Sequence, residues 1–313
     1  MNTLLLSTIA AIAPVPVSYL VEALRHPPSV PESPSWAPHL NYEYTKVNGH
    51  KIRYLKTGYG PAIVLLHTLR TQLDMWQKII PRLANHFTVY AMDHIGHGFS
   101  DIPKIDYTPE SFLQAVEGFL ENLNIVDTVV AGESIGGPLG LMLAAKHHPR
   151  VKQVIAIDSY DYDRGRGVYR SSLFGKILFG ISGIPILGAT FWRLRSYPAF
   201  KNIIMGGMVN PKNFPKQLMQ EMNAVGNRKG HYQAFMNLIH HFPEWESVRK
   251  DYGHIQIPTL LLFAEYDWST KKEREEVQAL IPNAQMCTLE NSGHFASLDA
   301  SEQLLNILIS TNS

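Results

Sequence analysis

Cysteine is almost absent from this sequence. Cys287 is the single cysteine among 313 residues, so the chain cannot form an internal disulfide. It falls in an expected strand at 284–289, where we predict a small buried hydrophobic side chain rather than a nucleophile. The sequence also lacks a His-Glu-x-x-His pattern, a calcium-type acidic loop and a glycine-rich phosphate loop. We therefore predict no metal site and no cofactor.

An excess of either charge is also missing. The chain has 28 Lys and Arg against 27 Asp and Glu, a net charge of +1. No strong overall field attracts nucleic acid, so we expect no nucleic-acid partner, and a small neutral or apolar molecule fits better. With 45% apolar residues, the chain can bury the core of one large domain, with or without an insertion. The composition leaves the oligomeric state open.

The N-terminal segment has no charged residue from Thr3 to Val21. Pro14 and Pro16 interrupt its apolar run after about a dozen residues, which is short for a transmembrane helix. No Lys or Arg precedes the run, which disfavours a signal peptide. Two interpretations remain: residues 3–21 contact a membrane, or they dock on the protein's own surface. The protein would accordingly be membrane-associated or cytoplasmic.

Residues 1–41 precede the body of the protein, and the prolines between residues 27 and 38 predict an extended linker. From residue 42 onward, short apolar runs alternate with helical patterns. A hairpin is expected around Asn48-Gly49, with strands at 42–47 and 50–56. The further strands are expected at 63–67, 87–93, 129–133, 154–158, 259–264 and 284–289, and the helices at 76–83, 109–123, 138–147, 271–281 and 300–310.

This alternation predicts an α/β fold with a central, mostly parallel sheet. It stops between residues 160 and 245, where only helical patterns occur. We therefore predict an α/β core formed by residues 42–159 and 246–313, with a helical insertion at 160–245. Ligands of such sheets bind beyond the carboxyl ends of the strands, so the loops that follow the strands should form the site.

One of these loops contains the pentapeptide Gly132-Glu133-Ser134-Ile135-Gly136. A serine between two such glycines, after a strand and before a helix, is typical of the strained turn that exposes a nucleophile. Placing Ser134 at a helix N-terminus directs the Ile135 N–H toward an anion that forms beside it.

A serine needs a base to remove its proton and an acid to orient that base. His294 follows the last expected strand and Asp267 follows the one before it, so both should reach the same cleft. The chain order Ser134, Asp267, His294 matches that of α/β-type serine hydrolases. Asp158 also follows a strand and Glu265 is close in sequence, so both remain alternatives for the acid.

Together these blocks resemble the α/β-hydrolase superfamily, in its esterase- and lipase-like branch with a helical cap. The resemblance covers residues 42–310 and rests on His67 and its loop, residues 93–101, the Ser134 pentapeptide, residues 258–267, and Gly293-His294-Phe295. It implies an α/β-hydrolase fold, a cap formed by residues 160–245, and an oxyanion hole formed by the N–H groups of Leu69 and Ile135. Family members usually have glycine where Thr68 stands, and Thr68 restricts the loop that must present the Leu69 N–H.

The resemblance and the residues together predict a serine esterase that acts on small to medium, largely apolar esters. Ser134 would be the nucleophile, His294 the general base and Asp267 its partner. Trp268 and Phe295 are expected to line the substrate pocket. Glu133 is expected to tune that pocket or to bond a nearby helix. A carbon–carbon bond hydrolase, a thioesterase or an acyltransferase could use the same triad, and a ligand-sensing protein could keep the fold with little turnover.

Overall fold

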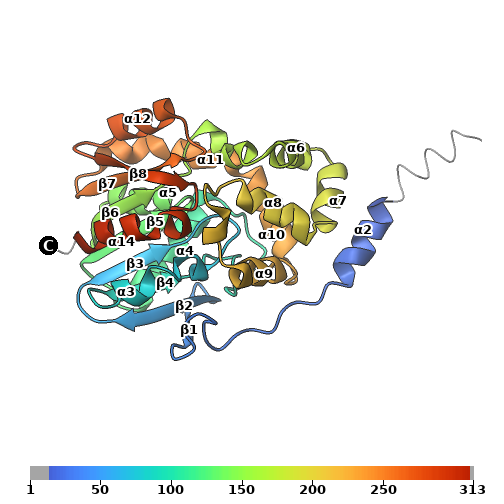
Figure 1. Cartoon of the computed structure of the whole chain (residues 1–313), viewed down its shortest axis with the longest axis horizontal. Coiled ribbons are helices and arrows are strands. Elements are labelled where there is room, and N and C mark those ends of the chain that lie inside the picture. The colour runs from blue at the N-terminus through green and yellow to red at the C-terminus, as the bar shows by residue number, and fades with distance from the viewer. Residues whose placement is uncertain (1–13, 311–313) are drawn as a thin grey trace, which may run out of the picture.

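The computed structural model describes residues 14–310, and at its centre lies an eight-stranded sheet (Figure 1). The strand order is β1-β2-β4-β3-β5-β6-β7-β8. β2 is antiparallel to β1 and to β4, and the other neighbouring strands are parallel. The strands are β1 (Tyr42–Val47), β2 (His50–Gly58), β3 (Ala62–Leu66), β4 (Thr88–Met92), β5 (Thr128–Glu133), β6 (Val151–Ile157), β7 (Thr259–Tyr266) and β8 (Gln285–Gly293).

The predicted α/β fold is confirmed, including its entry through an antiparallel hairpin. Asn48 and Gly49 both have positive φ, 50° and 84°, as a two-residue hairpin turn between twisted strands requires. The central strands β3, β4 and β5 are almost fully buried because helices cover both faces. β8 is longer than expected and extends to Gly293, so that it leads directly into His294.

Helices cover the two faces of the sheet and build two separate hydrophobic clusters. On one face lie η1 (Leu73–Trp76), α3 (Ile80–Leu83) and α14 (Ser301–Ser310). On the other lie α4 (Pro109–Asn122), α5 (Gly136–Ala145), η5 (Val248–His254) and α12 (Lys271–Leu280). The short helix α13 (Ala296–Asp299) follows His294.

The helix expected from 76 to 83 forms as two short pieces, η1 and α3. Pro81 lies in the first turn of α3 and has no N–H to continue a helix that began earlier. The apolar pattern of this segment was interpreted correctly, since Trp76, Ile80 and Leu83 are all buried.

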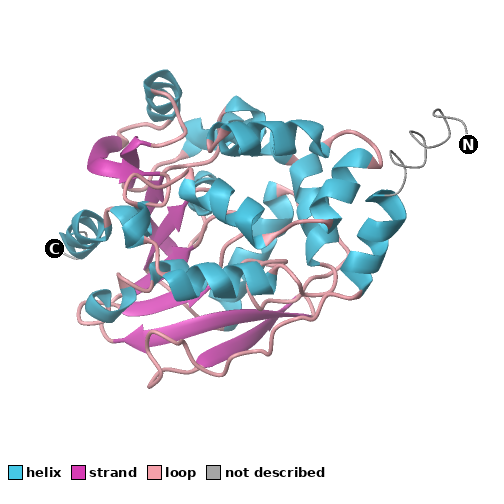
Figure 2. Cartoon of the chain, turned by 45° about the vertical axis from the view of Figure 1, so that its right-hand side comes forward, coloured by secondary structure: helices cyan, strands magenta, loops and turns pink. Residues whose placement is uncertain are grey.

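Residues 160–245, which we call the helical region, begin after β6 and end within α11. They contain η2 (Asp163–Gly165), η3 (Gly167–Arg170), α6 (Leu173–Ser182), α7 (Leu187–Arg193), α8 (Tyr197–Met205), η4 (Pro211–Asn213), α9 (Lys216–Val225) and α10 (His231–His240). Figures 1 and 2 show these helices beside the sheet, on one side of it. The next helix, α11 (Phe242–Ser247), spans the expected boundary at 245, and its Trp245 packs against Phe112 of α4.

The N-terminal helix α2 (Pro14–Ala23) packs against the helical region through polar contacts. Arg193 Nε donates to Ser18 Oγ at 2.8 Å, and Glu22 pairs with Arg195 at 2.6 Å. Val17, Leu20 and Leu24, at helical spacing, remain exposed.

Pro14 and Pro16 both lie in α2, so the described chain is helical at these prolines. Residues 3–13 of the expected apolar segment lie outside the described residues. Between residues 14 and 310, no helix has the length and apolar character needed to cross a membrane.

Cys287 is exposed, and the prediction that it is buried is wrong. Residues 285, 287 and 289 share one face of β8 because side chains alternate along a strand. That face is covered at Leu289, which packs in the same cluster as α14, but not toward the start of this edge strand. The sequence pattern identified the strand but not how far along it other residues bury this face.

Candidate active site

Ser134 lies in the tight turn that joins β5 to α5. Its φ is 56°, in the left-handed region that residues other than glycine seldom adopt. Such strain costs on the order of 1–3 kcal/mol and persists only where the surroundings impose it. A Cβ on Gly132 would collide with the carbonyl oxygen of Gly136, and one on Gly136 with that of Leu66. The two glycines therefore allow the turn that presents Ser134.

The structure brings Ser134, His294 and Asp267 into one hydrogen-bonded chain, although they are far apart in sequence. His294 Nδ1 lies 2.5 Å from Asp267 Oδ1, and His294 Nε2 lies 2.9 Å from Ser134 Oγ. The carboxylate accepts a hydrogen bond from Nδ1–H, so Nε2 of the neutral ring is left to accept one from the Ser134 hydroxyl. This is the geometry in which an imidazole can activate a hydroxyl.

The Asp267 carboxylate is fully buried but well supplied with partners. Its second oxygen accepts hydrogen bonds from the backbone N–H and the hydroxyl of Ser269. Burial alone would raise the pKa of Asp267, but the contacts with His294 and Ser269 outweigh burial and lower it. Asp267 is therefore held as an anion, the state that can stabilise a protonated His294.

Asp158, the rival for the acid, is also buried but does not contact His294. Its Oδ1 accepts from the Ala264 N–H at 2.7 Å, and its Oδ2 has no partner among the described residues. Burial and the neighbouring Asp267 raise the pKa of Asp158. Glu265, the other alternative, accepts from the Asn291 N–H at 2.9 Å. The geometry favours Asp267.

The expected oxyanion donors belong to two different loops. Ile135 immediately follows Ser134, and Leu69 follows β3. Within residues 14–310, neither backbone N–H has a hydrogen-bond partner. Both residues are buried, and a carbonyl oxygen within reach of both N–H groups would accept hydrogen bonds from two unsatisfied donors.

Thr68 fits this loop without strain, although relatives usually have glycine there. Its φ is not positive, and the left-handed conformation falls on Arg70 instead, with φ of 56°. The Thr68 carbonyl accepts from Thr71 Oγ1 and from His67 Nδ1, both at 2.8 Å. These bonds hold the loop that presents Leu69.

Glu133 does not lie in the substrate pocket, contrary to one of its two expected roles. It is fully buried, and its carboxylate accepts from the N–H of Ser297 at 2.7 Å and from its hydroxyl at 2.9 Å. It thus bonds the short helix α13 that follows His294, which is its other expected role. Burial, only partly offset by the bonds from Ser297, raises the pKa of Glu133 to about 7.

Trp268 and Phe295 contact the site directly. The Trp268 ring stacks on His294, with ring centroids 3.8 Å apart and planes at 14°. Both aromatic residues line a narrow cavity of about 30 Å³. Its other lining residues are Thr68, Leu69, Arg70, Val168, Phe179, Trp192, Phe200, Ile203, Ile204 and Phe235. The cavity joins the oxyanion loop to the helical region, as expected for an apolar acyl pocket.

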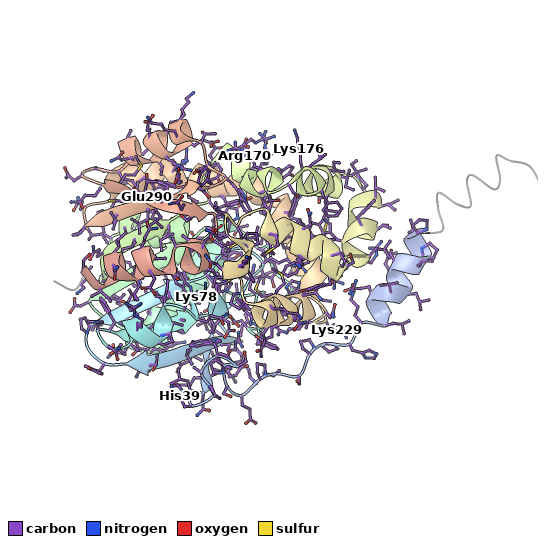
Figure 3. The ribbon with its side chains drawn as sticks, viewed as in Figure 1. His39, Lys78, Arg170, Lys176, Lys229 and Glu290 are labelled. Carbon is purple, nitrogen blue, oxygen red and sulfur yellow. The ribbon has the colours of Figure 1, made fainter. Side chains whose placement is uncertain are left out.

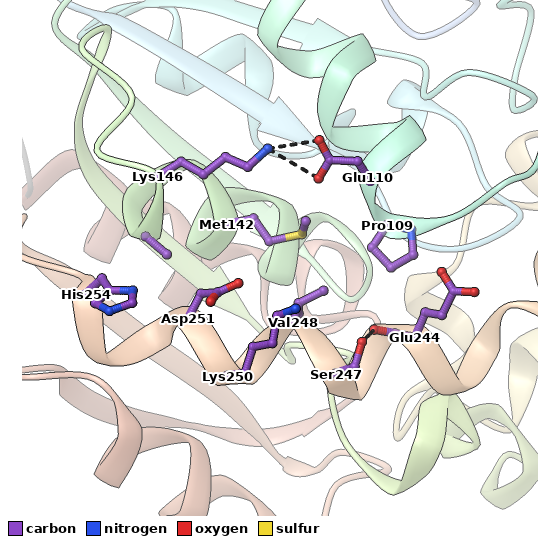
Figure 4. A pocket seen from close by; sticks show the side chains of 11 residues that line it. Pro109, Glu110, Met142, Lys146, Glu244, Ser247, Val248, Lys250, Asp251 and His254 are labelled. Atoms are coloured by element: carbon purple, nitrogen blue, oxygen red, sulfur yellow. Dashed lines mark hydrogen bonds and ion pairs between the residues drawn. The ribbon is translucent and has the colours of Figure 1, made fainter.

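A larger groove, of about 380 Å³, lies elsewhere, between α4, α5 and η5 (Figure 4). Lys146 and Glu110 form an exposed ion pair at its edge, 2.9 Å apart. None of the expected site residues lines it. In the described part of the chain, no group of three His, Cys, Asp or Glu side chains could hold a metal ion.

Two residues near the site escaped the sequence analysis. Asp299 accepts from the N–H groups of Val209 and Gly293, at 2.7 and 3.0 Å, and so ties the helical region to the loop that carries His294. Arg70 lies next to Leu69 and lines the narrow cavity. Nothing in the sequence pattern distinguishes Asp299 from a surface acid. Arg70 could have been noticed, because it is a cation directly after Leu69, the expected oxyanion residue.

Comparisons with known proteins agree with this architecture. A family described as "alpha/beta hydrolase fold" matches residues 61–175. A cis-3-alkyl-4-alkyloxetan-2-one decarboxylase of Shewanella oneidensis is 23% identical over 82% of this chain and 84% of its own length. A 2-hydroxy-6-oxo-6-(2'-aminophenyl)hexa-2,4-dienoic acid hydrolase of Metapseudomonas resinovorans is 30% identical, but over only 37% of this chain and 41% of its own.

Solved structures show the same fold. Cfl2 from Burkholderia cenocepacia superimposes with a TM-score of 0.79 at 20% identity, covering 91% of this chain and 100% of that one. The enol-lactonase from Burkholderia xenovorans gives a TM-score of 0.67 at 21% identity, covering 86% and 98%. At these identities the likeness concerns the fold alone.

Proposed function

Because this chain belongs to the α/β-hydrolase superfamily, we propose that it is a serine hydrolase that cleaves carboxylic esters through an acyl-enzyme intermediate. The observation that supports this proposal is the hydrogen-bonded chain Asp267–His294–Ser134. The backbone N–H groups of Ile135 and Leu69 are unsatisfied, and Trp268, which stacks on His294, lines an apolar cavity. Acyl transfer needs such donors and such a cavity. The substrate is small to medium and largely apolar.

In the first half of the reaction, Ser134 Oγ attacks the ester carbonyl carbon while His294 Nε2 takes its proton. The carbonyl oxygen becomes an oxyanion between the N–H groups of Leu69 and Ile135. His294 then gives the proton to the leaving alcohol, and the acyl group stays on Ser134. In the second half, His294 takes a proton from water, the hydroxide attacks the acyl carbon, and the acid is released as Ser134 regains its proton.

The helical region would act as a cap over this site. Ser134 and His294 are both completely buried, and Asp299 fastens the segment after α8 to the His294 loop. The narrow cavity has room for a small group only, so a substrate must displace part of its wall to enter. Opening of the cap would be the step that admits the substrate.

The test is hydrolysis of p-nitrophenyl esters of increasing acyl length by the wild type and by Ser134→Ala. We expect the wild type to act on a limited range of lengths. In a comparable triad, removal of the serine costs on the order of 10⁶-fold in kcat, so Ser134→Ala should be inactive. Equal rates for the two proteins, or no turnover by the wild type, would refute the esterase proposal.

A carbon–carbon bond hydrolase is the second candidate. It is favoured by the name of the relative from Metapseudomonas resinovorans, a dienoic acid hydrolase that is 30% identical over 37% of this chain. The same triad would serve, with a carbanion rather than an alcohol leaving. Turnover of a vinylogous 1,5-diketone acid, without turnover of esters, would select this reaction.

A further inference from the structure

Arg70 is a partly buried cation for which the chain supplies no anion. In the described part of the chain, its guanidinium makes no hydrogen bond and no ion pair, and its Nε is enclosed without a partner. Its Cζ lies 5.1 Å from the ring centroids of Phe200 and Phe235 and 5.9 Å from that of Trp192. Aromatic faces offset part of the cost of burying a cation, but they do not satisfy its N–H donors.

The neighbours of Arg70 add positive charge rather than remove it. Burial lowers the pKa of Arg70 to about 9, and repulsion from Arg195 and Arg25 adds to this effect. Glu22, the acid of this group, pairs with both of those arginines and not with Arg70. His231, also buried, has an Nδ1 without a partner in the described structure. Several hydrogen-bond donors therefore lie close together here, and no described group accepts a hydrogen bond from Arg70.

Arg70 lies where a substrate would be held. It is the charged residue that lines the narrow cavity, whose walls also include Leu69 and Trp268. It also lines an adjacent cavity of about 240 Å³, together with Trp192 and Phe200. A Cβ on Gly226 would lie 2.7 Å from Arg70 Nη2, so the absence of a side chain there makes room for the guanidinium. Arg70 thus stands between the oxyanion loop and the wider space beside it.

The helical region that surrounds Arg70 is strongly positive. Residues 160–245 contain eleven Lys and Arg against four Asp and Glu, although the whole chain is nearly neutral. Figure 3 shows Arg170, Lys176 and Lys229 on this region, while acidic residues prevail in the rest of the chain, with 23 against 17 basic ones. A field of this sign draws anions toward the cap.

We propose that Arg70 binds a carboxylate on the acyl part of the substrate, so that the enzyme prefers esters of dicarboxylic acids whose distal carboxyl is free. A guanidinium offers a planar fork of N–H donors that matches a carboxylate, and the three aromatic rings would flank the chain that joins the carboxylate to the ester. This inference rests on the esterase proposal and specifies its substrate. It replaces the expectation of a neutral substrate, which considered only the overall charge.

The kinetic test compares p-nitrophenyl hydrogen adipate with its distal methyl ester, which differs in charge but hardly in length. We expect the wild type to prefer the acid roughly 10- to 100-fold in kcat/KM, the usual range for a charge-assisted pair. Arg70→Met should abolish this preference, so that this variant hydrolyses the acid and the methyl ester with equal kcat/KM, and Arg70→Lys should keep part of the preference. Lys229→Met is the control, because it removes an exposed cation of the same region that lines neither cavity.

A wild type without preference for the acid, or an Arg70→Met variant that keeps the preference, would overturn the inference while the esterase proposal stands. A binding measurement separates the two proposals. Ser134→Ala is titrated calorimetrically with monoethyl adipate, with and without Arg70→Met. Arg70-dependent binding supports the anion site even if no ester is hydrolysed, whereas absent or Arg70-independent binding refutes it.

Discussion

Two arginines of this protein, one fully and one partly buried, lie against aromatic rings, yet they differ in what else surrounds them. Arg53, on β2, is fully buried, and its Cζ lies 4.2 Å from the ring centroid of Tyr42. Its Nε donates to Asp93 at 2.6 Å and its Nη2 to Asp74 at 3.2 Å. Arg70 has three such rings around it but no carboxylate. The chain neutralises the first cation and leaves the second to be neutralised from outside.

The pKa values change in opposite directions for this reason. Burial alone would lower the pKa of Arg53, but Asp93 and Asp74 outweigh burial and raise it. For Arg70, burial lowers the pKa and no described acid opposes it. A buried charge with internal partners holds the fold together, whereas a buried charge without them costs stability and is retained where it serves a ligand. The predictions below test this distinction.

The largest effect is expected at Asp267, a buried anion whose partner becomes charged only during the reaction. Asp267→Asn should lower kcat by roughly 10⁴-fold, because an amide no longer fixes the His294 tautomer or stabilises its protonated form. Ester hydrolysis at saturating substrate measures this loss. Asp158→Asn is the matched control, since that carboxyl does not contact His294, and it should stay active. A larger loss in the Asp158 variant would make Asp158 the acid of the triad.

Next in size is the loss of stability when the internally paired cation is removed. Arg53→Met leaves Asp74 and Asp93 buried without their counter-ion and should lower the free energy of unfolding by about 3–5 kcal/mol. Arg70→Met removes a cation that has no acid and should leave stability unchanged or raise it. Urea unfolding of both variants measures the difference. Equal losses of unfolding free energy in the two variants would show that Arg70 is paired with an acid, as Arg53 is with Asp93.

The buried acid Glu133 allows a similar comparison, in which the stability of the protein is measured as a function of pH. Its pKa is raised from 4.5 to about 7, so between these values the folded protein keeps a proton that the unfolded chain releases. Stability must therefore fall as pH rises from about 4.5 to 7, by about 3 kcal/mol in total. Glu133→Gln should lack this fall; its carbonyl can still accept from the Ser297 N–H, and its NH2 can donate to the Ser297 hydroxyl.

Unfolding in urea at pH 5 and pH 7.5 compares the two proteins. Asp158, whose pKa is also raised, is present in both, so its contribution cancels in the difference. Parallel pH profiles of the wild type and Glu133→Gln would mean that Glu133 is already ionised at the lower pH.

The smallest effect on activity is expected from the N-terminal segment, for which we propose contact with a membrane. Deletion of residues 1–13 should reduce flotation with lipid vesicles and leave the hydrolysis of soluble esters unchanged. Deletion through residue 26 is the less informative variant, because it also removes Glu22 and unpairs Arg195. Unchanged flotation after the shorter deletion would refute membrane contact through residues 3–13.

Most of the fold could be predicted because its signals are local. Apolar β-branched runs, the Asn48-Gly49 turn and the proline at the start of α4 each act within a few residues. The prediction failed where the burial of a side chain depended on residues remote in the sequence. Cys287 lies on a strand whose face is covered only further along. The role of Glu133 stayed open between two alternatives, because its partner Ser297 is remote in sequence.

The sequence by itself determined the α/β alternation, the strained turn at Ser134, and the loops in which Asp267 and His294 lie, because glycine spacing and strand ends are properties of short segments. Only the tertiary structure decided which carboxylate faces His294, that Glu133 supports α13, and that Arg70 lacks an acid. Each of these is a statement about which side chains share a buried space. Residues that share such a space come from loops far apart in the chain, and no local pattern records their pairing.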